Sequence, residues 1–413
     1  CEDIWNLGDN PLYTICPMDK MMQQSPDILL NLSASPFDYT HDEDRKATIK
    51  SNVVKYKKPL FYCNAIGSQT EIVFDGASLV FDKDANLCGA LPMFESAMQI
   101  FECNDDGSIN APILEPAASV PSKELNPSNL VPALNIDQVY KALVLGVKDY
   151  FNKMGFKKAI LGSSGGIDSA VTLAIACEAL GKENVYAILM PSPYSTPLSV
   201  DDAIELSKNL GNPYDILPIK EVYESFLHTL KPIFKDMPFS LAEENIQSRS
   251  RGNILMAIAN KLGYVLLNTS NKSELATGYG TLYGDMAGGF AVIKDVAKTL
   301  VYRLCQYRNS IEAVIPERIL TRAPSAELRP DQKDQDSLPE YEVLDAILAL
   351  YMEQDESIQS IIDRGFKPED VEKVTRLIKI NEYKRRQAPI GVRITQRAFG
   401  RDWRYPITNK FRA

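Results

Sequence analysis

The sequence predicts an α/β protein built around a doubly wound parallel sheet, with a smaller domain in front of it. Short apolar strands alternate with amphipathic helices from residue 136 onward, which is typical of a parallel sheet. A loop rich in glycine and serine, at residues 162–169, lies between one such strand and the next helix. A proline-rich segment separates this region from the first hundred residues, so we expect two domains.

The first domain is expected over residues 1–103. Apolar runs at 27–32 and 60–64 predict strands, and the charged stretch at 42–58 predicts a helix. Segments 70–74 and 77–81 flank Asp75-Gly76, a dipeptide that favours a β-hairpin.

Residues 104–135 form the predicted linker. They show no helical or strand periodicity and contain five prolines, Pro112, Pro116, Pro121, Pro127 and Pro132. Such a composition favours an extended, exposed connection.

The second domain is expected over residues 136–413. Its first helix begins at Ile136, with Val139, Leu143, Val144, Val147 and Phe151 on the apolar side. Strands are predicted at 159–161, 185–189 and 264–267, and helices at 169–180, 200–210 and 246–261.

The composition narrows the classes of function. The chain has 413 residues and a formal net charge of -9, which argues against DNA or RNA as a partner. No apolar run approaches the ~20 residues that span a bilayer, and the polar first residues predict no signal peptide. Seven scattered cysteines, no CxxC pair and two histidines favour neither zinc nor disulfides. We therefore expect a reduced, cytoplasmic protein with no membrane partner.

The loop at residues 162–169 carries the clearest chemistry. Its sequence is Gly162-Ser163-Ser164-Gly165-Gly166-Ile167-Asp168-Ser169. Paired glycines let the backbone approach an anion, while serine hydroxyls and the N–H groups of the following helix point at it. The carboxylate of Asp168 can hold Mg²⁺. The alternative is a connecting turn without function, which the strand–turn–helix context disfavours.

The SGGxDS pattern resembles the PP-loop ATP pyrophosphatases, which include several amide-forming synthetases. The stretch from Glu244 to Lys298 contains ENIQSR, LNTSNKSE, TGYGTLYGD and GGFAVIKDVAK. Together with Ala323-Pro324-Ser325 and Tyr383-Lys384, it is similar to the glutamine-dependent NAD+ synthetases. Ser325 is a mild departure, since we expect threonine there.

The resemblance implies a role for each matching residue. Residues 162–169, Thr269 and Lys298 would bind ATP, a substrate. Asp168 and Glu274 would hold Mg²⁺. The pocket for deamido-NAD+ would be lined by Asn245, Glu274, Tyr279, Gly280, Thr281, Leu282 and Lys384.

These side chains also have ordinary structural interpretations. Thr269 could cap a helix, with Glu274 as an exposed acid in its first turn. Lys298 could be a solvated lysine, and Lys384-Arg385-Arg386 a solvated basic run.

The front of the chain resembles the downstream half of a nitrilase-type amidase, an αββα fold with a Cys–Glu–Lys triad. Cys1-Glu2-Asp3-Ile4-Trp5 matches the region of the nucleophile. Cys1 would be the glutaminase nucleophile, and Ser35 and His41 would contact glutamine. His41 stands where a lysine or arginine is expected. The Glu and Lys precede the cysteine in such domains, so we expect glutamine hydrolysis by the complete protein and none by residues 1–413 alone.

Three rival functions stay open on the sequence. They are another PP-loop amidotransferase such as a GMP-type synthetase, a nitrilase-type amidase with a phosphate-binding appendage, and a nucleotide-binding scaffold. The resemblance also implies a homo-oligomer, at least a dimer, that uses glutamine or ammonia.

Overall fold

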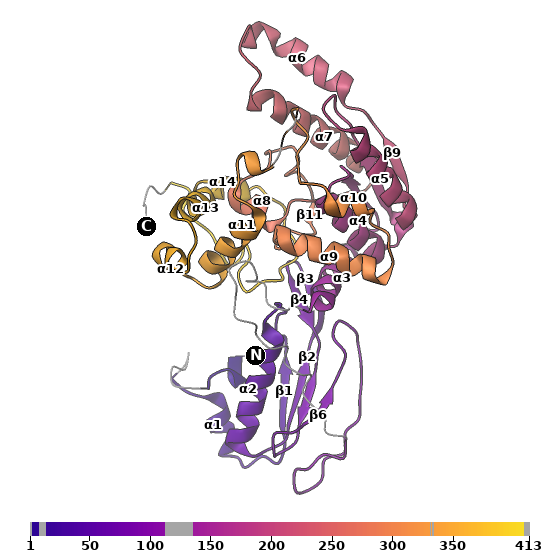
Figure 1. Cartoon of the computed structure of the whole chain (residues 1–413). Coiled ribbons are helices and arrows are strands. Elements are labelled where there is room, and N and C mark those ends of the chain that lie inside the picture. Colours follow the sequence, from indigo (N-terminus) through magenta and orange to yellow (C-terminus); the bar gives the residue numbers. More distant parts are fainter. Residues whose placement is uncertain (1, 8–13, 112–134, 331, 333, 409–413) are drawn as a thin grey trace. The chain divides into compact units, whose positions relative to one another are not determined.

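The computed structural model describes residues 2–7, 14–111, 135–330, 332 and 334–408. The chain forms two compact units, Cys1–Lys123 with Ala133–Gly146, and Glu124–Pro132 with Val147–Ala413. Most of the predicted linker, residues 112–134, lies outside the described residues. Figure 1 labels the helices and strands of both units.

The first unit contains a four-stranded sheet in the order β1-β2-β5-β6. β1 runs parallel to β2, and the other neighbours are antiparallel. Its core joins Ile49 and Val53 of helix α2 to Leu60 and Leu79 of the sheet. The elements are η1 (Glu2–Ile4), α1 (Pro17–Met22), β1 (Leu29–Ser33), α2 (His41–Tyr56), β2 (Leu60–Asn64), β3 (Ile66–Gln69), β4 (Ile72–Asp75), β5 (Leu79–Phe81) and β6 (Leu87–Ala90).

The hairpin predicted at Asp75-Gly76 is wrong. β4 pairs with β3, and the turn between them is at Thr70-Glu71. After Asp75 the chain has two consecutive positive φ angles, +70° at Gly76 and +48° at Ala77. This bend carries the chain into β5, which pairs with β2 and β6 instead. The dipeptide therefore marks a turn, but a turn between two sheets.

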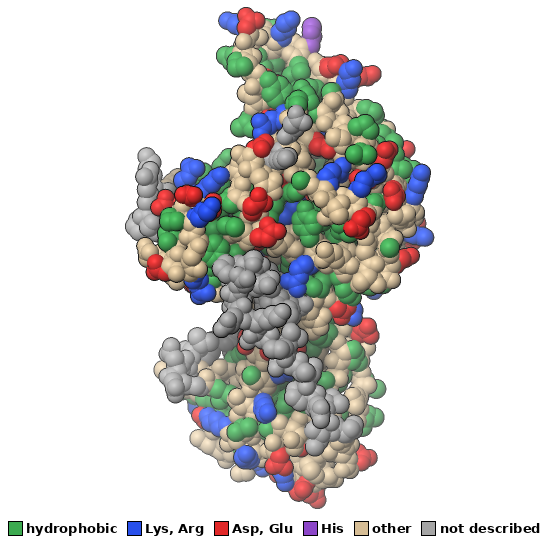
Figure 2. All heavy atoms as spheres, viewed as in Figure 1, with side chains coloured by type: hydrophobic (Ala, Val, Ile, Leu, Met, Phe, Trp, Pro, Cys, Tyr) green, Lys and Arg blue, Asp and Glu red, His purple; other side chains and the backbone are tan. Residues whose placement is uncertain are grey.

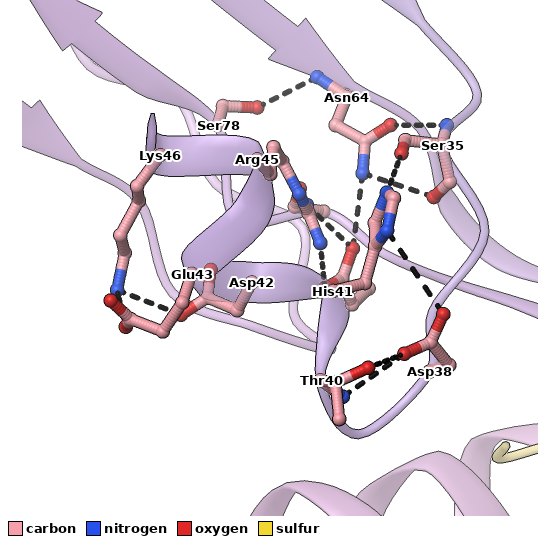
Figure 3. A network of polar contacts seen from close by, with 12 residues as sticks. Ser35, Asp38, Thr40, His41, Asp42, Glu43, Arg45, Lys46, Asn64 and Ser78 are labelled. Atoms are coloured by element: carbon pink, nitrogen blue, oxygen red, sulfur yellow. Dashed lines mark hydrogen bonds and ion pairs between the residues drawn. The ribbon is translucent and has the colours of Figure 1, made fainter. Parts of the chain in front are cut away.

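A buried ion pair fixes that bend. Both Arg45 and Asp75 are fully buried, and Arg45 Nη1 donates to Asp75 Oδ1 at 2.9 Å while Nη2 donates to Oδ2 at 2.6 Å. Asn64 Nδ2 donates to the same carboxylate at 3.0 Å, and Arg45 Nη1 donates to the Gly76 carbonyl at 3.3 Å (Figure 3). The pair therefore joins α2 to β2 and to the β4–β5 connection.

Replacing Arg45 with methionine is expected to lower the free energy of unfolding by about 3–5 kcal/mol, because Asp75 is left charged and buried. Urea unfolding of the whole chain measures the change. Lys55→Met is the control, since Lys55 and Asp19 form a 2.8 Å pair in which both side chains are about half exposed. That control should cost at most about 1 kcal/mol, and equal losses in the two variants would contradict the account.

The second unit contains the predicted parallel sheet. Its order is β11-β10-β7-β8-β9, and every neighbouring pair is parallel. The strands are β7 (Ala159–Gly162), β8 (Val185–Leu189), β9 (Tyr214–Ile216), β10 (Val265–Asn268) and β11 (Phe290–Ala291). Strands fed by helical crossovers confirm the α/β class.

Helices connect these strands, and further helices pack beside them. The long ones are α4 (Ile167–Leu180), α5 (Pro197–Leu210), α6 (Lys220–Phe234), α7 (Leu241–Leu262), α9 (Lys298–Ile311) and α13 (Pro368–Ile380), while α3 (Ile136–Met154) belongs to this unit only from Val147 onward. Shorter ones are α8 (Lys272–Thr277), α10 (Glu317–Thr321), α11 (Tyr341–Leu348), α12 (Ile358–Asp363) and α14 (Glu382–Arg385), with 3₁₀ turns at Lys182–Asn184 and Asp334–Asp336 and a π-helical turn at Ala349–Glu353.

The helix after the Gly/Ser-rich loop explains how that loop is held. α4 is buried along almost its whole length, from Ile167 to Cys177. It therefore lies between the sheet and α9 as a central core element. A loop joined to such a helix has little freedom to move. In the part of the chain that the structure describes, no helix is long and apolar enough to cross a membrane.

Candidate active site

A cavity of the second unit lies at the carboxyl ends of β7, β8 and β10. Its volume is about 310 Å³, and the whole of the predicted loop, residues 162–169, lines it. Thr269, Glu274, Tyr279 and Lys298 line it as well. In open parallel sheets, ligands bind at this edge, where the crossovers change direction.

The loop has the features of an anion site. Gly165 has a φ of +76°, and no side chain caps the first turn of the fully described helix α4. The Ser163 hydroxyl is buried and has no hydrogen-bond partner among the described residues. The Ser169 hydroxyl lies 3.1 Å from that of Ser164. Unpaired N–H and hydroxyl groups at a helix N-terminus favour bound phosphate.

Asp168 lies at the centre of a charged cluster. Lys298 Nζ forms an ion pair with Asp168 Oδ2, and Asn271 Nδ2 donates to Asp168 Oδ1 at 2.8 Å. Burial, followed by the charge of Asp168, holds the pKa of Glu274 well above its usual value. Burial alone would lower the pKa of Lys298, but the charges of Asp168 and Glu274 outweigh it and raise that pKa. Lys298 is therefore a cation that is paired with Asp168 and stabilised by the nearby Glu274.

Two of the ordinary interpretations are wrong. The cap of α8 is Asn271, which accepts from Glu274 N at 2.9 Å, and not Thr269. The Glu274 carboxylate lies at the cavity wall and accepts from Asn271 N at 3.3 Å. Lys298 is only 2% exposed, so it is not a solvated lysine.

The residues predicted to hold the dinucleotide lie in and beside the loop that follows α8. The Thr281 hydroxyl donates to Asn245 Oδ1 at 2.8 Å. Lys384 Nζ donates to the carbonyls of Gly278 and Gly280 at 2.7 and 2.8 Å. Of this set only Glu274 and Tyr279 line the cavity. Gly280, Thr281 and Leu282 follow Tyr279 directly in the chain, and Asn245 and Lys384 hydrogen-bond to this loop.

The basic run at 384–386 is only partly solvated. Arg385 is 5% exposed and donates to the carbonyls of Leu275 and Ala276 at 3.1 Å. Arg386 alone is exposed. The run therefore anchors the end of α8 next to the predicted pocket.

The cavity is also lined by five charged residues to which the sequence analysis assigned no role: Arg251, Asp285, Arg322, Glu327 and Asp334. Arg322 Nη2 donates to the Gly165 carbonyl at 2.6 Å. Asp334 Oδ2 accepts from the Tyr341 hydroxyl at 2.8 Å, and its Oδ1 has no partner in the described ranges. Arg249 ends the segment ENIQSR, and Arg251 follows it by two residues. Only the fold shows that Arg251 is the arginine that lines the cavity.

The two residues predicted to contact glutamine meet in the first unit. The Ser35 hydroxyl lies 2.8 Å from His41 Nε2 (Figure 3). The His41 ring stacks on Trp5, with centroids 4.9 Å apart. Burial lowers the pKa of His41 and outweighs the opposing charge of Asp38, so the ring is mainly neutral at pH 7. The predicted nucleophile Cys1 lies outside the described residues.

Comparisons with known proteins agree with this site. The family model for NAD synthase matches residues 139–388. A glutamine-dependent NAD(+) synthetase of Synechocystis is 45% identical over 416 residues, which cover all of this chain and 72% of the relative. The one from Thermotoga maritima is 44% identical over 432 residues, with 74% of the relative covered.

Solved structures extend the match. A glutamine-dependent NAD+ synthetase from Acinetobacter baumannii, in complex with ADP, has a TM-score of 0.69 and 42% identity, over 99% of this chain and 71% of that one. One from Cytophaga hutchinsonii, with 20% identity and a TM-score of 0.75, shows the fold alone. The matches cover the whole chain, which sets aside the GMP-type synthetase, the amidase and the scaffold. The chain belongs to the glutamine-dependent NAD+ synthetases, a family of ligases.

Proposed function

We propose that the cavity of the second unit converts deamido-NAD+ to NAD+ in two steps. The nicotinate carboxylate attacks the α-phosphorus of ATP, and pyrophosphate leaves. Ammonia then attacks the carbonyl carbon of the acyl adenylate, and AMP leaves. The observation that carries the proposal is the convergence of the anion-binding loop, Lys298, Asp168 and Glu274 on one cavity.

The loop at residues 162–169 is the proposed site of the ATP phosphates. The N–H groups of the uncapped first turn of α4 and the unpaired Ser163 hydroxyl match phosphate oxygens, and the Lys298 cation offsets charge that develops on them. Thr269 lines the same wall. Catalysis here consists mainly of positioning and charge stabilisation, because neither step needs a strong acid or base from the protein.

Asp168 and Glu274 are the proposed Mg²⁺ ligands. No group of three or more His, Cys, Asp or Glu suited to a metal occurs among the described residues. Two carboxylates suffice, because Mg²⁺ keeps several waters and phosphate oxygens. The raised pKa of Glu274 beside Asp168 fits a site that a divalent cation completes. Bound there, the ion would neutralise phosphate charge.

The loop after α8 is the proposed site of deamido-NAD+, through Asn245, Tyr279, Gly280, Thr281, Leu282 and Lys384. The contacts of Lys384 with Gly278 and Gly280 and of Thr281 with Asn245 hold this loop at the cavity edge. Such support lets a loop present its backbone to a substrate in one conformation.

The nitrogen donor is proposed to be glutamine in the complete protein, hydrolysed at Cys1 with Ser35 and His41 in contact with the substrate. Free ammonia would serve the second unit alone. The proposed boundaries remain 1–103 for the glutaminase portion, 104–135 for the linker and 136–413 for the synthetase domain, which contains the family match at 139–388.

We also propose a homo-oligomer. Its support is the apolar surface of α6 and the start of α7, where Phe226, Ile233, Met237, Phe239 and Leu241 are 41–70% exposed. Figure 2 shows apolar side chains gathered there. Soluble monomers rarely expose many large apolar side chains together. Sedimentation equilibrium should give at least a dimer, and a monomer at micromolar concentration would contradict this.

The direct test supplies deamido-NAD+, ATP and Mg²⁺ with either ammonium or glutamine, and measures NAD+ and AMP. NAD+ and AMP should form in equal amounts with ammonium. Absence of NAD+ with both donors would contradict the proposed substrate.

A further inference from the structure

The cavity wall carries a cation whose charge is not compensated. Among the residues that the structure describes, its lysine and arginine side chains are Arg251, Lys298 and Arg322. Lys298 is paired with Asp168. Arg322 lies 3.6 Å from Asp202 Oδ2 and donates to the Ser199 hydroxyl at 3.0 Å. The guanidinium of Arg251 has no ion pair within the described ranges.

One bond orients Arg251. It projects from α7, and its Nε donates to the Met190 carbonyl at 3.0 Å, just beyond the carboxyl end of β8. No other hydrogen bond ties its guanidinium to a residue that the structure describes. Because Nε is fixed, the two terminal nitrogens form a preoriented fork of donors at the cavity wall. A fork of this kind matches two oxygens of a phosphate.

The surroundings make the unpaired charge costly. Burial lowers the pKa of Arg251 to about 10, and the charges of Asp285 and Glu327 offset only part of this effect. Arg251 is partly buried, and a desolvated cation without an ion pair destabilises a folded protein. In a binding cavity that cost is recovered when an anion binds. The Ser163 hydroxyl, which is buried and has no partner among the described residues, lines the same cavity.

We propose that Arg251 binds a phosphate group of a nucleotide substrate in this cavity. The inference rests on the proposed nucleotide site and adds a residue to it. ATP and deamido-NAD+ both carry phosphates, so the shared chemistry is an oxyanion that accepts two N–H bonds. No acid–base step is assigned to Arg251, because guanidinium stays charged at neutral pH.

The test compares Arg251→Met, which removes the charge, with Arg251→Lys, which keeps the charge but loses the fork. Binding of ATP, pyrophosphate, adenosine and deamido-NAD+ is measured by calorimetry. Arg251→Met should weaken the binding of ATP and of pyrophosphate by about 10- to 100-fold, the range for charged hydrogen bonds. The affinity for adenosine should not change. The affinities of Arg251→Lys for ATP and pyrophosphate should lie between those of Arg251→Met and the wild type.

Two controls separate binding from folding. Arg308→Met removes an arginine of α9 that pairs with Glu312 at 3.1 Å and lies outside the cavity lining; its ATP affinity should match the wild type. The thermal midpoint of ligand-free Arg251→Met should equal or exceed that of the wild type, because the unpaired charge is gone. A purely structural role for Arg251 predicts a lower midpoint instead.

The outcomes are distinct. Weaker binding of deamido-NAD+ with unchanged ATP would assign the phosphate to the dinucleotide. Equal losses for adenosine and ATP, or no loss for any phosphate ligand, would overturn the inference. Failure of the wild type itself to bind ATP would overturn the proposed nucleotide site instead.

Discussion

Replacing Gly165 with alanine is expected to lower kcat/KM by at least about 100-fold, the scale for displacing a reacting group by about 1 Å. The backbone φ at Gly165 is +76°, a region in which side chains are strained. A Cβ built there would lie 2.1 Å from the Ser199 carbonyl oxygen. Since that atom is backbone, the loop or the start of α5 must move. Either shift displaces the proposed phosphate site.

A matched glycine controls for the strain alone. Gly263 has a φ of +73°, and a Cβ there meets nothing within 4 Å. Gly263→Ala should therefore cost about 1–2 kcal/mol of stability and leave the steady-state rate unchanged. Steady-state kinetics with ATP as the varied substrate measures both variants. Similar kinetics in the two variants would show that the close approach to Ser199 is not important.

Lys298→Ala is expected to lower kcat by about 10²- to 10³-fold, the scale for losing one preorganised charge contact. Lys298 is buried, contacts Asp168 and faces the cavity. Its removal leaves Asp168 and Glu274 without their nearby cation and removes a positive charge from the proposed phosphate site. The effect should appear in NAD+ formation at saturating ATP.

A lower rate in Lys298→Ala could also come from a less stable fold, so further variants distinguish the two causes. Lys298→Met fills the same volume, so it should unfold at a higher temperature than Lys298→Ala but be equally slow. Lys153→Ala removes the surface partner of Asp149, at 3.2 Å, and should have the wild-type rate. A near-wild-type rate for Lys298→Ala would exclude Lys298 from the site.

The sequence predicted the architecture of the second unit well because each element had a local signal. Apolar runs marked β7, β8 and β10, and glycines closed α4 and α5 at Gly181 and Gly211. The Gly/Ser-rich loop could be interpreted chemically because its function depends on backbone freedom and helix dipoles, which are local properties.

Pairing between strands could not be predicted in the same way. Asp75-Gly76 has the composition of a hairpin turn, but Asp75 is the buried partner of Arg45, thirty positions earlier in the chain. The burial of individual charged side chains could not be predicted either. Nothing local distinguishes Lys298, which is paired with Asp168, from the solvated Lys153. Arg251 was missed for the same reason, because an uncompensated charge can be recognised only when all of its neighbours are known.

The central claim is that the carboxylate of deamido-NAD+ is activated as an adenylate, and an isotope transfer tests it directly. Deamido-NAD+ with ¹⁸O in its carboxylate is incubated with ATP, Mg²⁺ and ammonium, and the products are analysed by mass spectrometry. Attack on the α-phosphorus followed by displacement of AMP should leave one ¹⁸O in AMP and none in pyrophosphate. ADP with labelled phosphate, or AMP without ¹⁸O, would contradict the mechanism.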